Sequence, residues 1–214
     1  MTHFRKLEGL YLVVSPILPF DKLLNATEKA LRGGVDLLQL IVEKETPEMI
    51  AFARDSSDLA REYKTLFLTN GSLRLAKEID AEGLHLDNYE ITPTEVKHAL
   101  RRDCIVGYTL SNDLERLRWA EKMGANYVSF CSVFPTFTAT QCQIVPLETV
   151  RRAKSRTSLP IFATGGITLE NAHLVLEAGV DGIAVTSALL KAEDPEQRAK
   201  SFKGIIRNYR RNIL

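Results

Sequence analysis

Cysteine is scarce in this chain, and its placement argues against two classes of protein. The 214 residues include three cysteines, Cys104, Cys131 and Cys142, and no two of them form a Cys-x-x-Cys pair. A zinc clip or a disulfide framework needs cysteines that are paired at suitable spacings. We therefore expect neither, and this cysteine usage predicts a reducing, cytoplasmic location.

An excess of charge and long apolar runs are missing as well. The net charge is +1, so composition predicts no nucleic-acid or membrane partner. The longest apolar runs are strand-sized, far below the roughly 18 residues of a membrane span. Residues 1–6 lack the apolar core of a signal peptide. No Gly/Ser-rich linker divides the chain, so we expect a single domain over residues 1–214.

What the chain does have is a regular alternation of strand-like and helical patterns. Buried parallel strands read as continuous apolar runs. The chain has eight such runs: Leu10–Val14, Leu37–Ile41, Leu66–Thr69, Gly83–Leu86, Ile105–Tyr108, Tyr127–Phe130, Ile161–Ala163 and Gly182–Val185. Helical periodicity predicts helices that include Lys22–Arg32, Pro47–Tyr63, Thr94–Arg101, Leu114–Met123 and about 195–210.

Eight strand–helix units in this length predict an α/β fold, a closed (β/α)8 TIM barrel. An open doubly wound sheet is the alternative. Two of the helix starts are well marked, because Pro47 and Pro93 stand in first turns and Thr46 and Thr92 precede them as N-caps.

In a barrel the functional site lies at the C-terminal ends of the strands. The last two predicted strands end in small residues, Gly165-Gly166 and Thr186-Ser187, which could leave backbone N–H groups free for a phosphate. The glycines could instead only form a tight turn, and the hydroxyls could only cap a helix. The loop 132–140 is rich in hydroxyl groups, which can donate to phosphate oxygens.

Other strand ends carry groups that can titrate. His85 follows an apolar run, with Asp87 and Glu90 close behind, a pattern that suits acid–base chemistry or metal binding as well as a structural histidine. Glu90 is the better magnesium candidate, since magnesium prefers carboxylate oxygen. Glu43 and Lys44 could belong to a site or to the surface. Cys131 is expected to be a buried filler.

Segments along nearly the whole chain resemble the thiamine phosphate synthase and thiazole tautomerase superfamily. The most specific are Phe134-Pro135-Thr136-x-Thr138 and Thr164-Gly165-Gly166-Ile167, together with Gly182-Ile183-Ala184-Val185-x-Ser187. Further resemblance lies in Gly9–Val13, Gly34–Leu40, Asn70 with Leu75-Ala76, Gly83–Leu86 and Gly124–Val128.

The resemblance implies a transferase of thiamine biosynthesis that condenses a hydroxymethylpyrimidine diphosphate with a thiazole phosphate. In such synthases diphosphate leaves with magnesium, and the thiazole nitrogen captures the pyrimidine cation. The resemblance assigns the thiazole phosphate to Thr136, Thr138, Gly165, Gly166, Thr186 and Ser187. It assigns Gln39 and Asn70 to the pyrimidine and diphosphate side, and Glu90 to Mg2+.

The diphosphate half departs from the family pattern. After the second strand the family has Gln-x-Arg-x-Lys, whereas this chain has Ile41 and Glu43 at the basic positions, with Lys44 one residue away. After the third strand Gly71 stands where the synthases have a magnesium-binding Asp. Ala139 replaces the Lys that follows Pro-Thr-x-Thr. Lost cations matter because a polyanion in a low-dielectric site needs neutralising.

Two other functions stay open. Asn70-Gly71 also resembles the tautomerase branch, which uses a His after the fifth strand where this chain has Ser111. His85 could compensate for it, and His85, Lys44 and Thr109 are the catalytic candidates. The third hypothesis is a non-catalytic barrel that binds phosphate ligands. Expected partners are small phosphorylated thiazole and pyrimidine ligands, and the sequence leaves a homodimer open.

Overall fold

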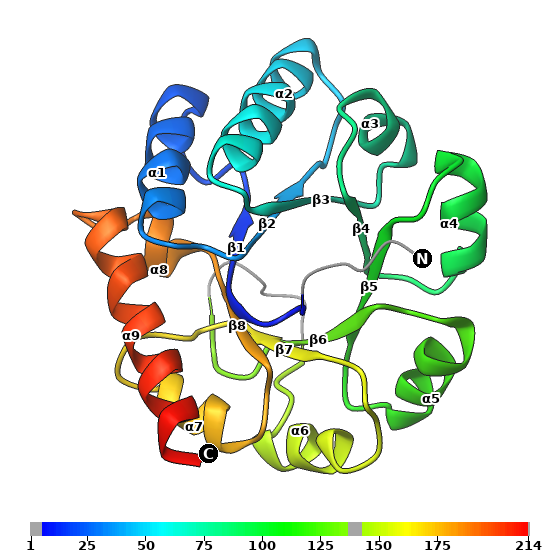
Figure 1. Ribbon diagram of the computed structural model, residues 1–214, viewed down its shortest axis with the longest axis vertical. Coiled ribbons are helices and arrows are strands. Elements are labelled where there is room, and N and C mark those ends of the chain that lie inside the picture. The colour runs from blue at the N-terminus through cyan, green and yellow to red at the C-terminus, as the bar shows by residue number, and fades with distance from the viewer. Residues whose placement is uncertain (1–5, 137–142, 214) are drawn as a thin grey trace.

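A computed structural model describes residues 6–136 and 143–213 of the chain. Eight parallel strands form a closed ring, in which each strand pairs with its sequence neighbours and β8 returns to β1 (Figure 1). The strands are β1 Gly9–Val14, β2 Leu37–Ile41, β3 Leu66–Asn70, β4 Gly83–Leu86, β5 Ile105–Leu110, β6 Tyr127–Cys131, β7 Ile161–Thr164 and β8 Gly182–Val185. The (β/α)8 barrel is confirmed. Because Gly9 pairs with Gly182 and closes the ring, the open sheet is wrong.

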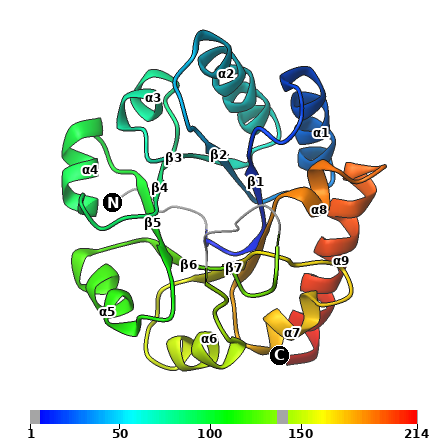
Figure 2. The same ribbon diagram turned by 180° about the vertical axis from the view of Figure 1, so that it is seen from behind.

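Helices surround the ring on its outside (Figures 1 and 2). They are α1 Phe20–Arg32, α2 Pro47–Glu62, α3 Leu73–Glu78, α4 Pro93–Leu100, α5 Leu114–Met123, α6 Leu147–Lys154, α7 Ala172–Glu177, α8 Ser187–Leu190 and α9 Pro195–Ile213. In the described part of the chain, no helix has the length and apolar character that crossing a bilayer requires.

The predicted N-caps form, and they fix where the helices begin. The Thr46 hydroxyl accepts a hydrogen bond from the Met49 N–H at 3.2 Å. Thr92 and Glu95 form a reciprocal capping box, so α4 begins at Pro93. It ends one residue earlier than predicted because Arg101 adopts a left-handed conformation, with φ of 56°.

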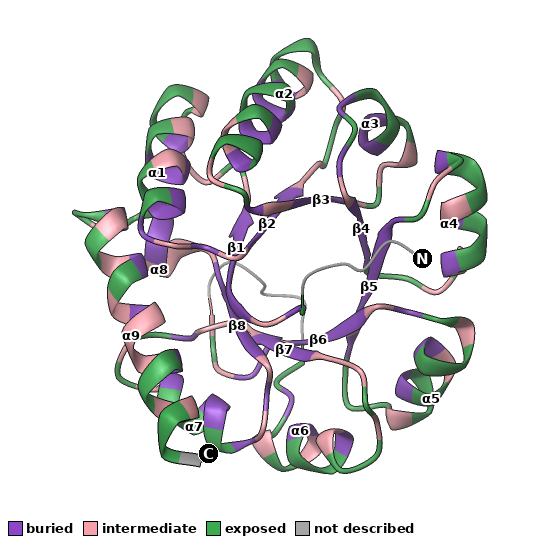
Figure 3. Ribbon diagram, viewed as in Figure 1, coloured by how far each residue is buried: buried purple, intermediate pink, exposed green. Residues whose placement is uncertain are grey.

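Buried side chains occupy two layers. Strand residues and the inward faces of the helices are buried, whereas the outer helix faces are exposed (Figure 3). A second cluster fills the inside of the ring: Leu7, Tyr11, Val13, Leu37, Leu68, Ile105, Tyr127, Phe162 and Ala184. Packing on both faces explains why the strands read as continuous apolar runs.

Five strands (β1, β3, β5, β6 and β7) extend further than their apolar runs indicate, and β3 and β5 show why. Asn70 pairs with His85 as the last residue of β3, and Thr109 pairs with Ser129 within β5. A hydrophobic pattern stops at these polar residues, although the backbone ladder continues through them. Their side chains consequently belong to strands rather than to loops.

Candidate functional site

A cavity of about 690 Å³ opens at the C-terminal ends of the strands. Residues from every strand or the segment after it contribute to its wall, as expected for a barrel. Nine of the predicted site residues line it: Gln39, Asn70, His85, Thr109, Thr136, Gly165, Gly166, Thr186 and Ser187. Their roles in binding or catalysis stay predictions.

The turn after β7 requires its two glycines. Gly165 and Gly166 have φ angles of +93° and +65°, a region that favours glycine. A Cβ at Gly165 would collide with the Ser132 side chain, and one at Gly166 with the Pro135 carbonyl. The loop after β6 therefore packs directly against this turn, and both glycines line the cavity.

The Asn171 side chain fixes the same turn. Its Oδ1 accepts from the Thr168 N–H at 2.8 Å, and its Nδ2 donates to the Gly166 carbonyl at 3.0 Å. The N–H groups of Gly165, Gly166 and Ser187 donate no hydrogen bond to another described residue. Unused N–H groups on a fixed turn suit an anionic oxygen.

Lys191 adds a positive charge to this side of the cavity. It caps the C-terminus of α8, the helix that begins at Ser187. Of the lysines and arginines in the described ranges, only Lys191 lines the cavity, and its ammonium group has no ion-pair partner there. Sequence reasoning missed this residue, because only the fold of the short helix turns it toward the cavity.

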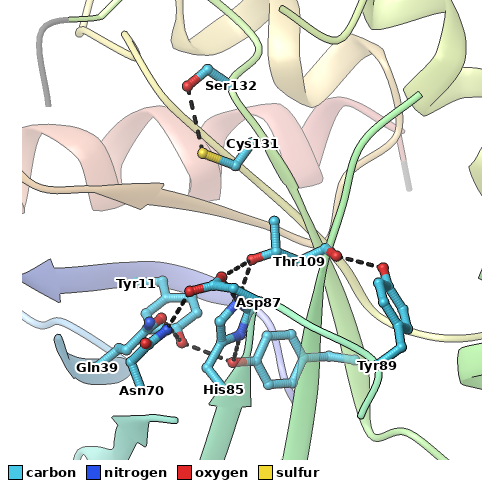
Figure 4. A network of polar contacts seen from close by, with 10 residues as sticks. Tyr11, Gln39, Asn70, His85, Asp87, Tyr89, Thr109, Cys131 and Ser132 are labelled. Atoms are coloured by element: carbon cyan, nitrogen blue, oxygen red, sulfur yellow. Dashed lines mark hydrogen bonds and ion pairs between the residues drawn. The ribbon is translucent and has the colours of Figure 1, made fainter. Parts of the chain in front are cut away.

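A chain of polar contacts crosses the floor of the cavity (Figure 4). The Tyr11 hydroxyl donates to Gln39 Oε1 at 2.6 Å and lies 2.8 Å from the Tyr127 hydroxyl. Tyr127 lies 2.7 Å from His85 Nδ1, and His85 Nε2 lies 2.8 Å from Thr109 Oγ1. His85 is 4% exposed, so this chain of contacts lies almost out of reach of solvent.

The polar chain ends at the cavity wall on Asp87. Thr109 Oγ1 donates to Asp87 Oδ1 at 2.6 Å, and Asn70 Nδ2 donates to Asp87 Oδ2 at 2.9 Å. Asp87 Oδ1 also lies 3.8 Å from His85 Nε2. Unlike His85, the Asp87 side chain is 62% exposed. Asp87 thus connects the buried histidine to the open cavity.

Burial and charge act in opposite directions on this pair. Burial lowers the pKa of His85, and the Asp87 carboxylate opposes that effect. Desolvation acts to raise the pKa of Asp87, but His85 and the hydrogen bonds from Thr109 and Asn70 outweigh it, so the pKa is lowered. The carboxylate is consequently ionised at neutral pH.

The remaining predicted residues lie elsewhere. Lys44 and Glu90 are exposed and are not among the described residues that line the cavity. Thr138 and Ala139 lie outside the described residues. Cys131, expected to be a buried filler, is half-buried and lines the cavity. Its side chain is no part of the core because β6 ends there.

The described residues do not assemble a ready metal site. They contain no group of three His, Cys, Asp or Glu side chains placed to hold a metal ion. Asp87 is the one Asp or Glu among the described cavity-lining residues, and both its oxygens already accept hydrogen bonds. The sequence placed Asp87 beside His85, but only loop geometry shows that it lines the cavity and that Glu90 does not.

Comparison with known proteins gives a consistent result. The family model described as thiamine monophosphate synthase matches residues 10–189. A thiamine-phosphate synthase from Desulfitobacterium hafniense is 38% identical over 205 residues, covering 94% of this chain and 98% of the relative. One from Clostridium perfringens is 34% identical over 198 residues, covering 92% of this chain and 95% of that protein.

A solved structure agrees with these relatives. The thiamine phosphate pyrophosphorylase of Pyrococcus furiosus superposes with a TM-score of 0.82 at 30% identity, covering 94% of this chain and 96% of that chain. An orotidine 5'-phosphate decarboxylase from Pyrococcus horikoshii, at 13% identity and a TM-score of 0.69, covering 92% of this chain and 99% of that chain, shares the fold alone. Since the family match spans most of the barrel, this chain belongs to the thiamine monophosphate synthase family.

Proposed function

We propose that this protein is a thiamine-phosphate synthase-type transferase. It would join a hydroxymethylpyrimidine diphosphate to a thiazole phosphate and release diphosphate. The observation that carries the proposal is its 38% identity to a thiamine-phosphate synthase over 98% of that protein's length. The cavity supports it, because a volume of about 690 Å³ at the strand ends suits small ligands.

The thiazole phosphate would bind at the ends of β7 and β8. There Gly165, Gly166, Thr186, Ser187 and Lys191 all line the cavity, and the N–H groups of Gly165, Gly166 and Ser187 donate no hydrogen bond to another described residue. Thr136 lines the cavity beside them, and Thr138 is expected to act with it. Charge-assisted hydrogen bonds from Lys191 would add to those from backbone and hydroxyl donors.

The condensation would take place between this phosphate subsite and the floor of the cavity. The bond between the pyrimidine methylene carbon and diphosphate breaks, and diphosphate takes the electron pair. The thiazole nitrogen then uses its lone pair to form the new carbon–nitrogen bond. Gln39 and Asn70 line the opposite side of the cavity and would orient the pyrimidine. The apolar lower wall would exclude water from the cation.

The expected magnesium ion does not fit the described residues. Gly71 supplies no carboxylate, Glu90 does not line the cavity, and Asp87 is engaged by Thr109 and Asn70. No step proposed for these residues passes through a metal. Comparing the assay with and without magnesium therefore tests whether the ion enters the site already bound to the diphosphate of the substrate.

A second candidate is an isomerase of the tautomerase type. The observation that favours it is the contact chain from His85 through Thr109 to Asp87, which joins titratable groups to the cavity. The condensation itself needs no proton carrier, whereas moving a proton between two positions of a thiazole does. His85 and Thr109 are the candidate residues for this step; Lys44 would need to approach the cavity, which it does not line.

The test is a product assay with purified protein, both substrates, and magnesium present or omitted. The synthase proposal predicts thiamine phosphate, detected by chromatography, at a rate far above a protein-free control. No product under either condition would reject it. A parallel assay with a thiazole carboxylate phosphate alone tests the isomerase. Binding without turnover in both assays would favour the third hypothesis, a non-catalytic barrel that binds phosphate ligands.

The cytoplasmic location, a homodimer and action as one domain stay predictions.

A further inference from the structure

The polar chain on the cavity floor ends in a hydrogen-bond acceptor on each side. At one end Gln39 Oε1 accepts from Tyr11, and at the other the Asp87 carboxylate accepts from Thr109. Burial raises the pKa of Tyr11 and of Tyr127, so each hydroxyl keeps one proton to donate. The direction of every link can therefore be counted.

The count fixes the protons on His85. Tyr11 gives its proton to Gln39, so it accepts from Tyr127, and Tyr127 in turn accepts from His85 Nδ1–H. Thr109 gives its proton to Asp87 and accepts from His85 Nε2–H. With the Gln39 amide in this orientation, His85 carries protons on both nitrogens.

Turning the Gln39 amide by 180° gives the other consistent pattern. The amide nitrogen would then donate to Tyr11, Tyr11 to Tyr127, and Tyr127 to His85 Nδ1. His85 would keep only the proton on Nε2, because the Asp87 end is unchanged. Apart from the amide, only hydrogens change place, because the hydroxyl hydrogens turn and the Nδ1 proton leaves the ring. The orientation of one amide thus corresponds to one proton on a histidine two tyrosines away.

We propose that Gln39 and His85 are coupled through Tyr11 and Tyr127, so that a ligand which orients the Gln39 amide changes the proton count of His85. Gln39 lines the cavity. A ligand atom that accepts a hydrogen bond from the amide nitrogen holds Oε1 toward Tyr11 and favours the doubly protonated ring. A ligand that donates to Oε1 favours the singly protonated ring. This coupling does not rest on the proposed function.

The surroundings of the His85 ring allow it to carry either one proton or two. Burial lowers the pKa of His85, which favours one proton, and the Asp87 carboxylate favours two. Phe162 and Ala184, from β7 and β8, complete this part of the core and carry no titratable group. Two other titratable groups lie nearby: Tyr89, whose hydroxyl donates to the Thr109 carbonyl at 2.6 Å, and Lys191, which lines the cavity.

The proton that distinguishes the two patterns can leave along the same chain. The Nδ1 proton moves to the Tyr127 hydroxyl, the Tyr127 proton moves to the Tyr11 hydroxyl, and the Tyr11 proton moves to a basic ligand atom in the cavity, which Tyr11 lines. Both hydroxyls again hold one proton, and the neutral imidazole keeps its proton on Nε2. The reverse sequence takes a proton back.

The test is a double-mutant cycle read on the His85 ring by 15N NMR over pH 4–9. Gln39→Met has nearly the same size and carries no charge, but it leaves the Tyr11 proton without an acceptor when His85 is doubly protonated. We expect it to lower the proton affinity of His85 about tenfold, the usual effect of one buried unsatisfied donor. In a Tyr11→Phe background the same change should have less than a twofold effect (~0.3 in pKa). Gln197→Met on α9 is the control substitution.

Four results would overturn the coupling. The first two are an equal effect of Gln39→Met in both backgrounds and no effect in either. The other two are a neutral His85 protonated on Nδ1 and a His85 ring that stays singly protonated down to pH 4. Thermal unfolding checks that each variant folds. If Tyr11→Phe does not fold, Tyr127→Phe breaks the next link and completes the same cycle.

Discussion

Two walls of one cavity offer a ligand opposite chemistry. At the ends of β7 and β8, the wall includes Gly165, Gly166 and Ser187, whose N–H groups donate to no other described residue, together with the positively charged Lys191. At the ends of β3 to β5, the wall presents an ionised carboxylate on Asp87. The first wall attracts an anion, and the second repels one.

The proposed reaction uses two anionic substrates, a thiazole phosphate and a pyrimidine diphosphate, and the difference between the walls indicates which of them the described residues suit. A monophosphate finds several donors and one cation on the β7–β8 wall. A diphosphate on the β3–β5 wall would meet Asp87, with no lysine or arginine among the described residues there that line the cavity. Phosphate binding at the β7–β8 wall, called the phosphate wall below, stays a prediction, and we expect the affinity for pyrimidine diphosphate to be weaker than the affinity for thiazole phosphate.

The largest expected effect is on the phosphate wall. Gly166→Ala places a Cβ against the Pro135 carbonyl in a backbone region that disfavours alanine. We expect affinity for thiazole phosphate to fall by about 100-fold, which is about 2.7 kcal/mol, because the N–H groups lose their placement. Isothermal titration calorimetry measures it.

Gly124→Ala is the matched control for that substitution. Gly124 also has a positive φ, +82°, but no atom lies within 4 Å of a Cβ built there. It carries the same backbone strain without a collision and lies outside the described cavity lining. If both variants lose affinity equally, strain rather than the phosphate wall explains the result.

A smaller effect is expected for the cation of the same wall. Lys191→Met should weaken thiazole phosphate binding about fivefold to tenfold, since one charge-assisted contact near the surface is lost. The loss should shrink as salt concentration rises. Lys44→Met, which alters a lysine that does not line the cavity, serves as control. Equal losses in the two variants would remove Lys191 from the site.

Removing the carboxylate should make the two walls more alike. Asp87→Asn keeps the side-chain size but removes the negative charge, so affinity for the pyrimidine diphosphate should rise about threefold. Thiazole phosphate binding should change less. Glu90→Gln, which removes a nearby carboxylate outside the cavity lining, should change neither. A weaker diphosphate complex in Asp87→Asn would show that the carboxylate does not repel this ligand.

The smallest effect is on stability against pH. Because the pKa of Asp87 is lowered in the folded protein, its ionised form stabilises the fold at pH values above the ordinary pKa of about 4. That contribution is lost as the pH falls through the lowered value. For an exposed group we expect less than about 1 kcal/mol. Urea unfolding of wild type and Asp87→Asn at pH 3 and pH 7 measures it, and a difference that grows at pH 3 would contradict it.

Much of the fold could be predicted because its signals are local. The apolar runs marked the strands, and Thr92 with Pro93 marked a helix start. Gly165-Gly166 was readable as a turn at a strand end. Asp87 and Lys191 were not readable as cavity residues, because their direction depends on how a loop and a short helix fold. The role of Tyr11 could not be predicted from the sequence either, since its hydrogen-bond partners are residues far along the chain.

Calorimetric titration of the wild-type protein with each substrate alone tests the contrast between the walls most directly. Thiazole phosphate and hydroxymethylpyrimidine diphosphate would be titrated at pH 7 without magnesium, and the second also with it. The structure predicts that thiazole phosphate binds at least about tenfold more tightly than the metal-free diphosphate, a difference of about 1.4 kcal/mol. Tighter binding of the metal-free diphosphate would contradict the assignment of the phosphate wall to β7 and β8.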